Sequence, residues 1–276
     1  MSTPLIAISP AKLNLFLHIN GRREDGYHNL QTLFQLLNWG DTLSFIANDS
    51  GKISVDIKGL DIPNEQNLIW RAASKLQSGS LGAHITVIKH IPTGGGLGGG
   101  SSNAATTLLV LRHLWGLPFE RDELLSIGAE LGADVPVFIA GRTAWAEGIG
   151  DVLTPLELPP RWFVIIRPNC HVSTEKIFSS RQLTRDTAPI KIAAFFTGST
   201  RNDCQAVVRD IYPEVDNALK WLNNFGRAIL TGTGACVFAS FNTKAEADAV
   251  LQQLPKKWTG FTAQGLNESP THSVLV

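Results

Sequence analysis

The first residues of the chain alternate between hydrophobic and polar positions with a period of two. In residues 5–18 (LIAISPAKLNLFLH) this alternation predicts a β-strand. Successive side chains of a strand point to opposite faces, so two sets of residues are expected to separate. One face would carry Ala11, Leu13, Leu15 and Leu17, and the other would carry Lys12, Asn14, Phe16 and His18.

Later segments either alternate in the same way or repeat with helical spacing, which predicts a mixed α+β fold. The predicted strands are residues 41–47, 52–58, 84–91, 142–146, 162–168, 228–231, 235–241 and 261–265. The predicted helices are residues 67–77, 101–115, 121–131, 174–181, 203–208, 214–224 and 244–254. The sequence NDSG at 48–51 predicts a hairpin turn between the strands on either side of it.

A proline-bearing segment, TPLELPPR at 154–161, is the best candidate for a linker. It divides the chain into two predicted domains, an N-terminal domain of residues 1–153 and a C-terminal domain of residues 160–267. Residues 268–276 either follow the second domain or rejoin the first as a strand, and the pattern leaves both arrangements open.

Composition adds limits to this picture. The 276 residues are 43% hydrophobic and 17% charged, which predicts a sizeable buried core. The net charge of +0 gives no overall attraction to nucleic acid or to an anionic membrane. Three cysteines without a CxxC pair argue against a disulfide framework or a structural zinc site. We expect a soluble, cytoplasmic protein, since the chain shows neither a signal peptide pattern nor an apolar run of about 20 residues. Its oligomeric state stays unknown.

The glycine-rich stretch PTGGGLGGGSSNAATTL, residues 92–108, is the strongest local signal. It lies between a predicted strand and a predicted helix, and Ser101, Ser102 and Asn103 are residue types that favour a helix N-cap. Glycines let a ligand approach the backbone, and the amide groups and dipole at a helix N-terminus attract negative charge. The serine hydroxyls could add contacts to phosphate. Phosphate binding is therefore favoured over a merely flexible loop, since ordering glycine is entropically costly.

Three common nucleotide-binding motifs do not account for this stretch. The P-loop pattern fails because Gly100 stands where a lysine is required. The dinucleotide fingerprint is matched literally by Gly94, Gly96 and Gly99, but Glu120, at the distance of its acidic residue, belongs to the helical segment FERDELLSIGAEL instead of ending a strand. The DFG and HRD motifs of protein kinases do not occur.

The stretch instead resembles the phosphate-binding motif of the GHMP small-molecule kinases. Two further segments resemble motifs of that family in the same order, PAKLNLFL at 10–17 and LTGTGACVFA at 230–239. The resemblance implies a two-domain α+β GHMP kinase fold with the active site in the inter-domain cleft. The N-terminal domain would bind ATP, and the C-terminal domain would bind the second substrate.

Two more segments, GRREDGYHNLQTLFQ at 21–35 and LGADVPVF at 131–138, resemble a branch of the family that acts on a cytidyl diphosphate substrate. This implies transfer of the γ-phosphate of ATP to the 2-hydroxyl of a methylerythritol group, in the non-mevalonate route to isoprenoid precursors. The alternatives are a GHMP kinase of the homoserine or mevalonate type, or an inactive nucleotide-binding sensor. Lys12 and Asp134 together argue against a sensor.

The catalytic candidates are Lys12 and Asp134, with Asn14 two residues from the lysine on the same strand face. From the residues alone, Lys12 could be a solvent-facing lysine, and Asp134 is slightly better explained as an N-cap than as a catalytic group. The resemblance implies that Asp134 takes the proton of the substrate hydroxyl, and that Lys12 orients Asp134 or stabilises charge on the transferring group.

Further site residues are also implied by the resemblance. Those assigned to ATP are Pro92, Thr93, Gly94, Gly95, Gly96, Leu97, Gly98, Gly99, Gly100, Ser101, Ser102, Asn67 and Lys89. Those assigned to the second substrate are Asn14, Tyr27, His28, Thr174, Phe178, Gly232 and Gly234, with the cytosine between the rings of Tyr27 and Phe178. From the residues alone, Asn67 could equally be a helix N-cap and Lys89 a surface lysine. Mg²⁺ is implied as a cofactor carried by ATP, because no carboxylate cluster suggests protein ligands.

Overall fold

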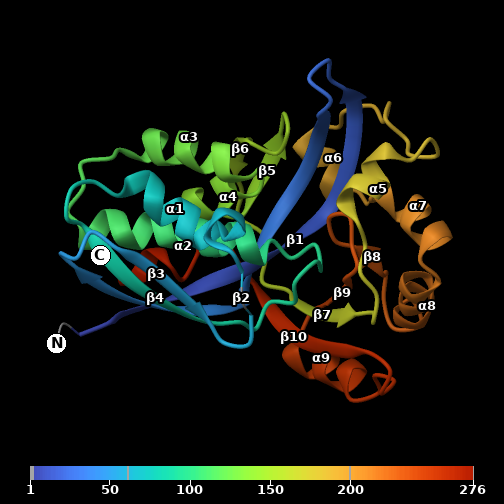
Figure 1. Ribbon diagram of the computed structural model, residues 1–276. Helices are drawn as coiled ribbons and strands as arrows, with labels where there is room; N and C mark the ends of the chain where they lie inside the picture. The colour runs from blue at the N-terminus through green and yellow to red at the C-terminus, as the bar shows by residue number, and fades with distance from the viewer. Residues whose placement is uncertain (1–2, 61, 199, 276) are drawn as a thin grey trace.

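The computed structural model describes residues 3–60, 62–198 and 200–275. Helices and strands are mixed along the chain, and the described strands join into one ten-stranded sheet whose main path is β3-β4-β2-β10-β7-β9-β8. The first half carries helices α1 to α4 beside strands β1 to β4, and the second half carries α5 to α9 around β7 to β10 (Figure 1). The α+β fold expected from the sequence is confirmed.

Two long strands form the framework of the first half. Strand β1 (Leu5–Arg22) pairs antiparallel with β2 (His28–Asn48) over nearly its whole length. The second part of β2 pairs with β4 (Gly82–Ile88), and β3 (Ile53–Ile57) pairs parallel with β4. The first part of β2 pairs with β5 (Ala144–Glu147), which pairs with β6 (Val152–Pro155).

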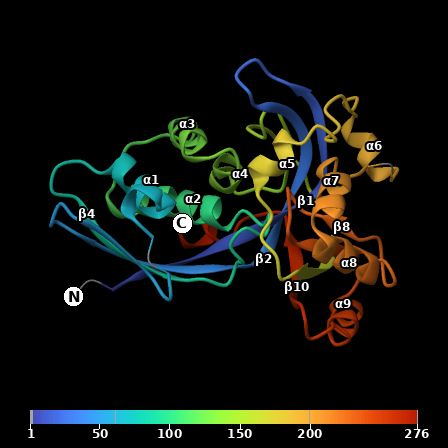
Figure 2. The ribbon, with the colours of Figure 1, turned by 45° about the vertical axis from the view of Figure 1, so that its right-hand side comes forward.

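Four α-helices of the first half gather on one face of this sheet (Figures 1 and 2). They are α1 (Leu68–Leu76), α2 (Gly99–Leu114), α3 (Arg121–Leu131) and α4 (Val135–Ala140), with a short 3₁₀ turn, η1 (Asn64–Gln66), before α1. Every residue of α2 from Ser102 to Leu111 is buried, so this helix is the centre of the core.

The second half packs helices against a smaller part of the sheet. Strand β7 (Trp162–Arg167) lies between β9 (Val237–Phe241) and β10 (Thr259–Leu266), and β8 (Ile229–Leu230) pairs with β9. The helices are α5 (Thr174–Ser179), α6 (Ile192–Phe196), α7 (Cys204–Ile211), α8 (Pro213–Leu222) and α9 (Lys244–Leu251). Because β10 pairs with both β7 and β2, one strand joins the two halves.

The end of the chain returns to the first half. Glu268 forms an isolated antiparallel β-bridge with Arg142, and Thr271 donates a hydrogen bond from Oγ1 to the carbonyl of Ile8 at 2.7 Å. Instead of a strand, the segment forms a 3₁₀ turn, η2 (His272–Val274), beside α2. Val276 lies outside the described residues. The domain boundaries expected from the sequence stay a prediction.

Several predicted elements need correction. The NDSG turn does not make a hairpin of its flanking strands, because β4 inserts between β2 and β3. Residues 28–40 and the helices α4 and α6 were not predicted, since their short apolar runs carry no clear period. The predicted linker at 154–161 begins inside β6.

The predicted alternation of β1 also breaks after Asn14. A register shift between Asn14 and Leu17 moves Leu17 to the face of Lys12 and Asn14, where all three line one cavity, while Phe16 turns into a separate core cluster. A β-bulge reverses the side-chain alternation in this way, and it cannot be seen from hydrophobicity alone.

Candidate active site

The glycine-rich segment forms a tight loop that ends where α2 begins. Gly94, Gly96 and Gly98 have φ values of 69°, 74° and 73°, in the left-handed region that glycine adopts readily. Among the described residues no side chain caps α2 at Gly98, so the amides of its first turn can face an anion. Since α2 starts at Gly99 and not at 101, Ser101 and its neighbours lie inside the helix instead of capping it.

Close packing explains two of these glycines. A Cβ on Gly96 would overlap the carbonyl oxygen of Thr231. A Cβ on Gly98 would lie 2.8 Å from Cζ of Phe138 and 3.1 Å from Cε of Lys12. The bare backbone at Gly98 therefore lets the Lys12 side chain pass directly beside the loop.

A second glycine-bearing loop, residues 231–236, lies against the first. The backbone N–H groups of Ala235 and Cys236 donate to the carbonyls of Gly94 and Gly95, each at 3.2 Å. These contacts bring together segments more than 130 residues apart in the sequence. Residues from the second half of the chain thus complete the wall of the site.

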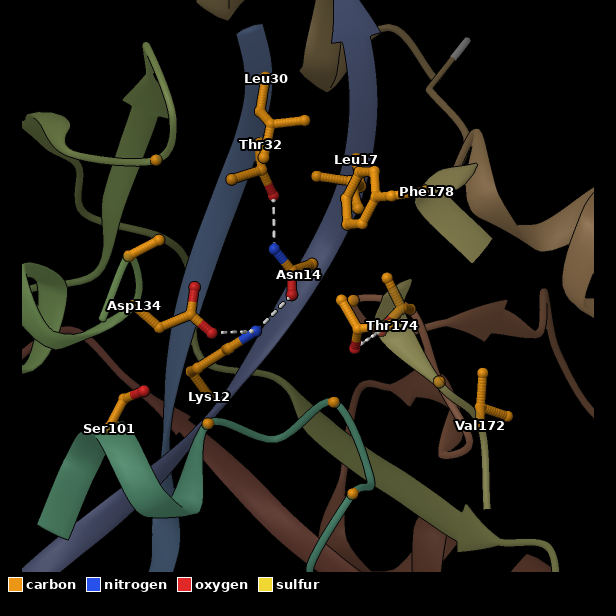
Figure 3. Close-up of a pocket in the computed structure, with 18 of the residues that line it drawn as sticks. Lys12, Asn14, Leu17, Leu30, Thr32, Ser101, Asp134, Val172, Thr174 and Phe178 are labelled. Atoms are coloured by element: carbon orange, nitrogen blue, oxygen red, sulfur yellow. Dashed lines mark hydrogen bonds and ion pairs between the residues drawn. The ribbon is translucent and has the colours of Figure 1, made fainter. Parts of the chain in front are cut away.

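The side chain of Lys12 is the centre of a buried polar network (Figure 3). Its Nζ donates to Oδ1 of Asn14 at 2.6 Å and lies 3.2 Å from Oδ2 of Asp134. Asn14 donates in turn from Nδ2 to Oγ1 of Thr32 at 3.0 Å. Lys12 is only 3% exposed, whereas Asp134 is 35% exposed. The ammonium group is therefore fixed within the protein while the carboxylate remains accessible from the cavity.

Asp134 occupies the N-cap position of α4 without acting as its cap. Within the described part of the chain, its carboxylate accepts no hydrogen bond from the helix and turns toward Lys12 instead. From the residues alone, an N-cap role for Asp134 was slightly better supported than a catalytic one. The geometry gives Asp134 a different partner, and it supports a role in the site.

Two cavities meet at the glycine loop, with volumes of about 520 Å³ and about 340 Å³. Both are lined by Gly94, Gly96, Gly98 and Ser101. The larger one also contains Lys12, Asn14, Asp134, Thr174, Phe178, Gly232 and Gly234. The smaller one also contains Asn67, Lys89, Pro92, Thr93, Gly95, Leu97, Gly99 and Gly100. A polyphosphate along the loop would pass from the second cavity into the first.

Three residues assigned to the nucleotide have structural partners. Lys89 forms an ion pair with the buried Asp41, and Asn67 caps α1. Both still line the smaller cavity. Ser102 is fully buried and accepts a hydrogen bond from Oγ of Ser9 at 2.7 Å, so it lines neither cavity. The expected contact between the Ser102 hydroxyl and phosphate is therefore not what the geometry offers.

A third cavity, of about 440 Å³, adjoins the larger one. It brings together Tyr27, His28, Thr174 and Phe178, four of the residues assigned to the second substrate. Tyr27 is 62% exposed at its edge. The His28 ring stacks on Phe178, with centroids 5.1 Å apart and an interplanar angle of 27°. Burial lowers the pKa of His28, and the positive charges of Arg185 and Arg22 lower it further.

Sequence reasoning missed residues that support the site. Thr32 and Thr231 each hydrogen-bond to Asn14, the first from β2 and the second from the loop at 231–236. Thr233 lies 2.8 Å from Thr174, hydroxyl to hydroxyl. Had residues 28–40 been recognised as a strand, its alternation could have placed Thr32 on the face of Asn14. No local signal links Thr231 to β1.

Metal binding and membrane insertion depend on side-chain clusters and helix lengths that can be read from the described residues. Among them, no group of three or more His, Cys, Asp or Glu side chains is arranged to hold a metal ion. They therefore do not fit a Mg²⁺ ion held by the protein alone. None of the helices in the described ranges is long and apolar enough to span a bilayer.

The fold and site define a class of protein. A glycine loop at a helix start, with an ammonium–carboxylate pair at the end of its cavity, suits a kinase that acts on a small molecule. Residues 67–142 match the family model described as GHMP kinases N terminal domain, and residues 182–260 match GHMP kinases C terminal. The chain belongs to the GHMP kinase family.

The similar relatives of this chain indicate one kind of kinase within the GHMP kinase family. A protein of Pseudomonas aeruginosa (strain UCBPP-PA14) named 4-diphosphocytidyl-2-C-methyl-D-erythritol kinase is 53% identical, covering 100% of this chain and 99% of the relative. A relative of the same name from Hahella chejuensis is 51% identical, covering 97% and 95%. Within the GHMP kinases, the chain groups with the 4-diphosphocytidyl-2-C-methyl-D-erythritol kinases.

Solved structures of GHMP kinases are similar to this chain in fold. A crystal structure of 4-(cytidine 5'-diphospho)-2C-methyl-D-erythritol kinase is 31% identical, with a TM-score of 0.81, covering 94% of this chain and 98% of that one. The mevalonate kinase of Methanococcus jannaschii has a TM-score of 0.69 at 15% identity, covering 96% of this chain and 99% of that one. The latter likeness shows the fold alone.

Proposed function

We propose that this kinase transfers the γ-phosphoryl group of ATP to the 2-hydroxyl of 4-diphosphocytidyl-2-C-methyl-D-erythritol, and that it does so in the cytoplasm. The observation that carries the proposal is the Lys12–Asp134 pair, 3.2 Å apart, in the cavity that shares its glycine loop with the nucleotide side. A phosphate chain and a substrate hydroxyl would meet at this pair.

In the proposed reaction, the hydroxyl oxygen attacks the γ-phosphorus of ATP. The bond from that phosphorus to the bridging oxygen breaks, ADP leaves with the electron pair, and the hydroxyl proton passes to the carboxylate of Asp134. Lys12 faces the negative charge that develops on the transferring group. Because Asn14 fixes the ammonium group from behind, little rearrangement is needed during the reaction.

The remaining assignments follow the cavities. The backbone amides from Gly94 to Ser101 bind the phosphates of ATP, and Asn67 and Lys89 lie near its nucleoside. Gly232 and Gly234 let the backbone approach the diphosphate of the second substrate. Mg²⁺ is carried by ATP on its own phosphate oxygens in this proposal.

The cytidyl group is assigned to the adjoining cavity. The ring of Tyr27 stacks on the cytosine, and the backbone of His28 contacts the edge of the base. Thr174 and Phe178 lie on the opposite wall. Stacking of this kind contributes about 1–3 kcal/mol per base.

The test is to incubate the purified chain with ATP, Mg²⁺ and the cytidyl substrate, and to detect the product by mass spectrometry. One added phosphate and an equal amount of ADP are expected. Homoserine and mevalonate serve as the matched alternative substrates. Phosphorylation of one of these in preference to the cytidyl compound would contradict the proposed substrate, and ATP binding without ADP formation would indicate a sensor.

A further inference from the structure

Arg185 makes an unusual set of contacts beside the third cavity. Its Nε donates to Nε2 of His28 at 3.1 Å, across 157 residues of sequence. Its Nη2 donates to the carbonyls of Phe178 at 2.7 Å and Ser180 at 2.8 Å, and its Nη1 donates to that of Leu183 at 3.1 Å. One guanidinium group thus binds the His28 ring and the backbone that carries the Phe178 ring.

These contacts fix the protonation of His28. A guanidinium group can only donate hydrogen bonds, so Nε2 of His28 must accept with its lone pair. The ring is then neutral, with its proton on Nδ1. An imidazolium would place an N–H group against the N–H of Arg185.

We propose that Arg185 is a positioning residue for substrate recognition, holding His28 as the neutral Nδ1–H tautomer and stacked on Phe178 before the substrate binds. The proposal rests on the proposed function, because the cytidyl group gives this cavity its role. Side chains ordered in advance lose less entropy when a ligand binds, so the effect belongs in substrate affinity.

The electrostatic surroundings of His28 agree with the geometry. Arg22 of β1 and Arg185 are the positive charges that act on the His28 ring. Tyr27, and Glu175 from α5, line the third cavity together with His28. Burial is the main cause of the lowered pKa of His28, followed by Arg185 and then Arg22. Removal of Arg185 is therefore expected to raise the pKa of His28.

The test compares Arg185→Gln with Arg181→Gln, which removes an exposed arginine four residues away. Turnover of the cytidyl substrate by the wild type is measured first, so that a chain lacking this activity is distinguished from one in which Arg185 plays no part. For Arg185→Gln we expect KM for the cytidyl substrate to rise about 10-fold, with kcat and KM for ATP within about 2-fold. Arg181→Gln should match the wild type.

A second readout uses nuclear magnetic resonance of the histidine ring nitrogens in the substrate-free protein. In the wild type at neutral pH, Nε2 of His28 should be unprotonated, and the pKa of His28 should be higher in Arg185→Gln than in the wild type. Arg185→Lys should not restore KM, because an ammonium group cannot reach the ring and the carbonyls together. A wild-type His28 protonated on Nε2, or an unchanged KM and pKa in Arg185→Gln, would overturn the proposal. The wild-type measurement decides the tautomer even where the variants fold poorly.

Discussion

The site that holds the Lys12–Asp134 pair and the cavity that holds Tyr27 differ in how firmly they are built. In the first, Lys12 and Asn14 are buried and connected by hydrogen bonds to β2 and to the loop at 231–236. In the second, Tyr27 is mostly exposed, and Arg185 donates hydrogen bonds to the His28 ring and to the backbone carbonyl of Phe178.

The difference agrees with the proposed function, in which the first region transfers the phosphoryl group and the second binds the base. Phosphoryl transfer depends on placing charges within a few tenths of an ångström, so a buried network suits it. Stacking on a base tolerates small shifts, because its energy comes from the overlap of two flat surfaces. Changes in the first region should therefore act on kcat, and changes in the second on KM for the cytidyl substrate.

The largest effect is expected from Asp134→Asn. The carboxylate can accept the hydroxyl proton and the amide cannot, so kcat should fall about 1,000-fold. Because Asp134 is the counter-charge of the buried Lys12 ammonium, the melting temperature should fall, while the amide oxygen of the asparagine can still accept a hydrogen bond from Lys12 and let the chain fold. Turnover and thermal melting check this together. Retention of most of the wild-type kcat would remove Asp134 from the reaction and end the contrast between the two regions.

The next effect concerns the glycine loop, through Gly96→Ala. Both a left-handed φ of 74° and the overlap with the Thr231 carbonyl oppose a methyl group there, so the loop must shift. We expect kcat/KM for ATP to fall about 100-fold. Gly116→Ala is the matched control, since Gly116 has a φ of 62° with open space around its position. Equal losses of ATP turnover in both variants would show that backbone strain alone, and not the loop contact, is responsible.

The sequence identified candidate site residues better than it predicted the long-range packing. The glycine loop, Lys12 and Asp134 could be named as candidates because motif and residue type mark them within short segments. Thr231, Thr233 and Arg185 could not, because their partners lie 59 to 217 residues away and no periodicity records such pairs. Tertiary contacts decide what a polar side chain binds.

The strand order shows the same limit. The turn at 48–51 has the composition of a hairpin, yet β4 takes the place beside β2 and leaves β3 at the edge. The bulge after Asn14 moves Leu17 onto the face of the site, which a strict alternation would not allow. Pairing partners and bulges depend on the whole sheet, so a local pattern cannot determine them.

A smaller effect is expected from Tyr27→Ala. Loss of one stacked ring should raise KM for the cytidyl substrate about 10-fold, with kcat within about 2-fold. Tyr27→Phe keeps the flat ring and should stay near the wild-type KM, which makes it the control. Steady-state kinetics with both substrates varied separates the two constants. A fall in kcat as large as that of Asp134→Asn would mean that the open region is as closely tied to the chemistry as the buried one.

The smallest effect concerns acid stability and involves both regions. His28 lies in the third cavity, the one that contains Tyr27, and His272 lies against Gly141 at the far end of α4, the helix that follows Asp134. Burial lowers the pKa of both histidines in the folded state, so the unfolded chain takes up protons first as the pH falls. Their contribution to stability is complete above about pH 6.5, the unfolded pKa, and is lost as the pH falls below it. The melting temperature should therefore drop between about pH 7 and pH 5.

The variants His28→Asn and His272→Asn should each reduce the slope of the melting temperature against pH, because each removes one group that the folded state keeps neutral. His113→Asn, at an exposed position on α2, is the surface control. Melting temperatures measured at intervals across this pH range test all three. If only His272→Asn reduces the dependence of the melting temperature on pH, the third cavity is looser in solution than the stacking of His28 on Phe178 implies. The contrast between the two regions then becomes sharper.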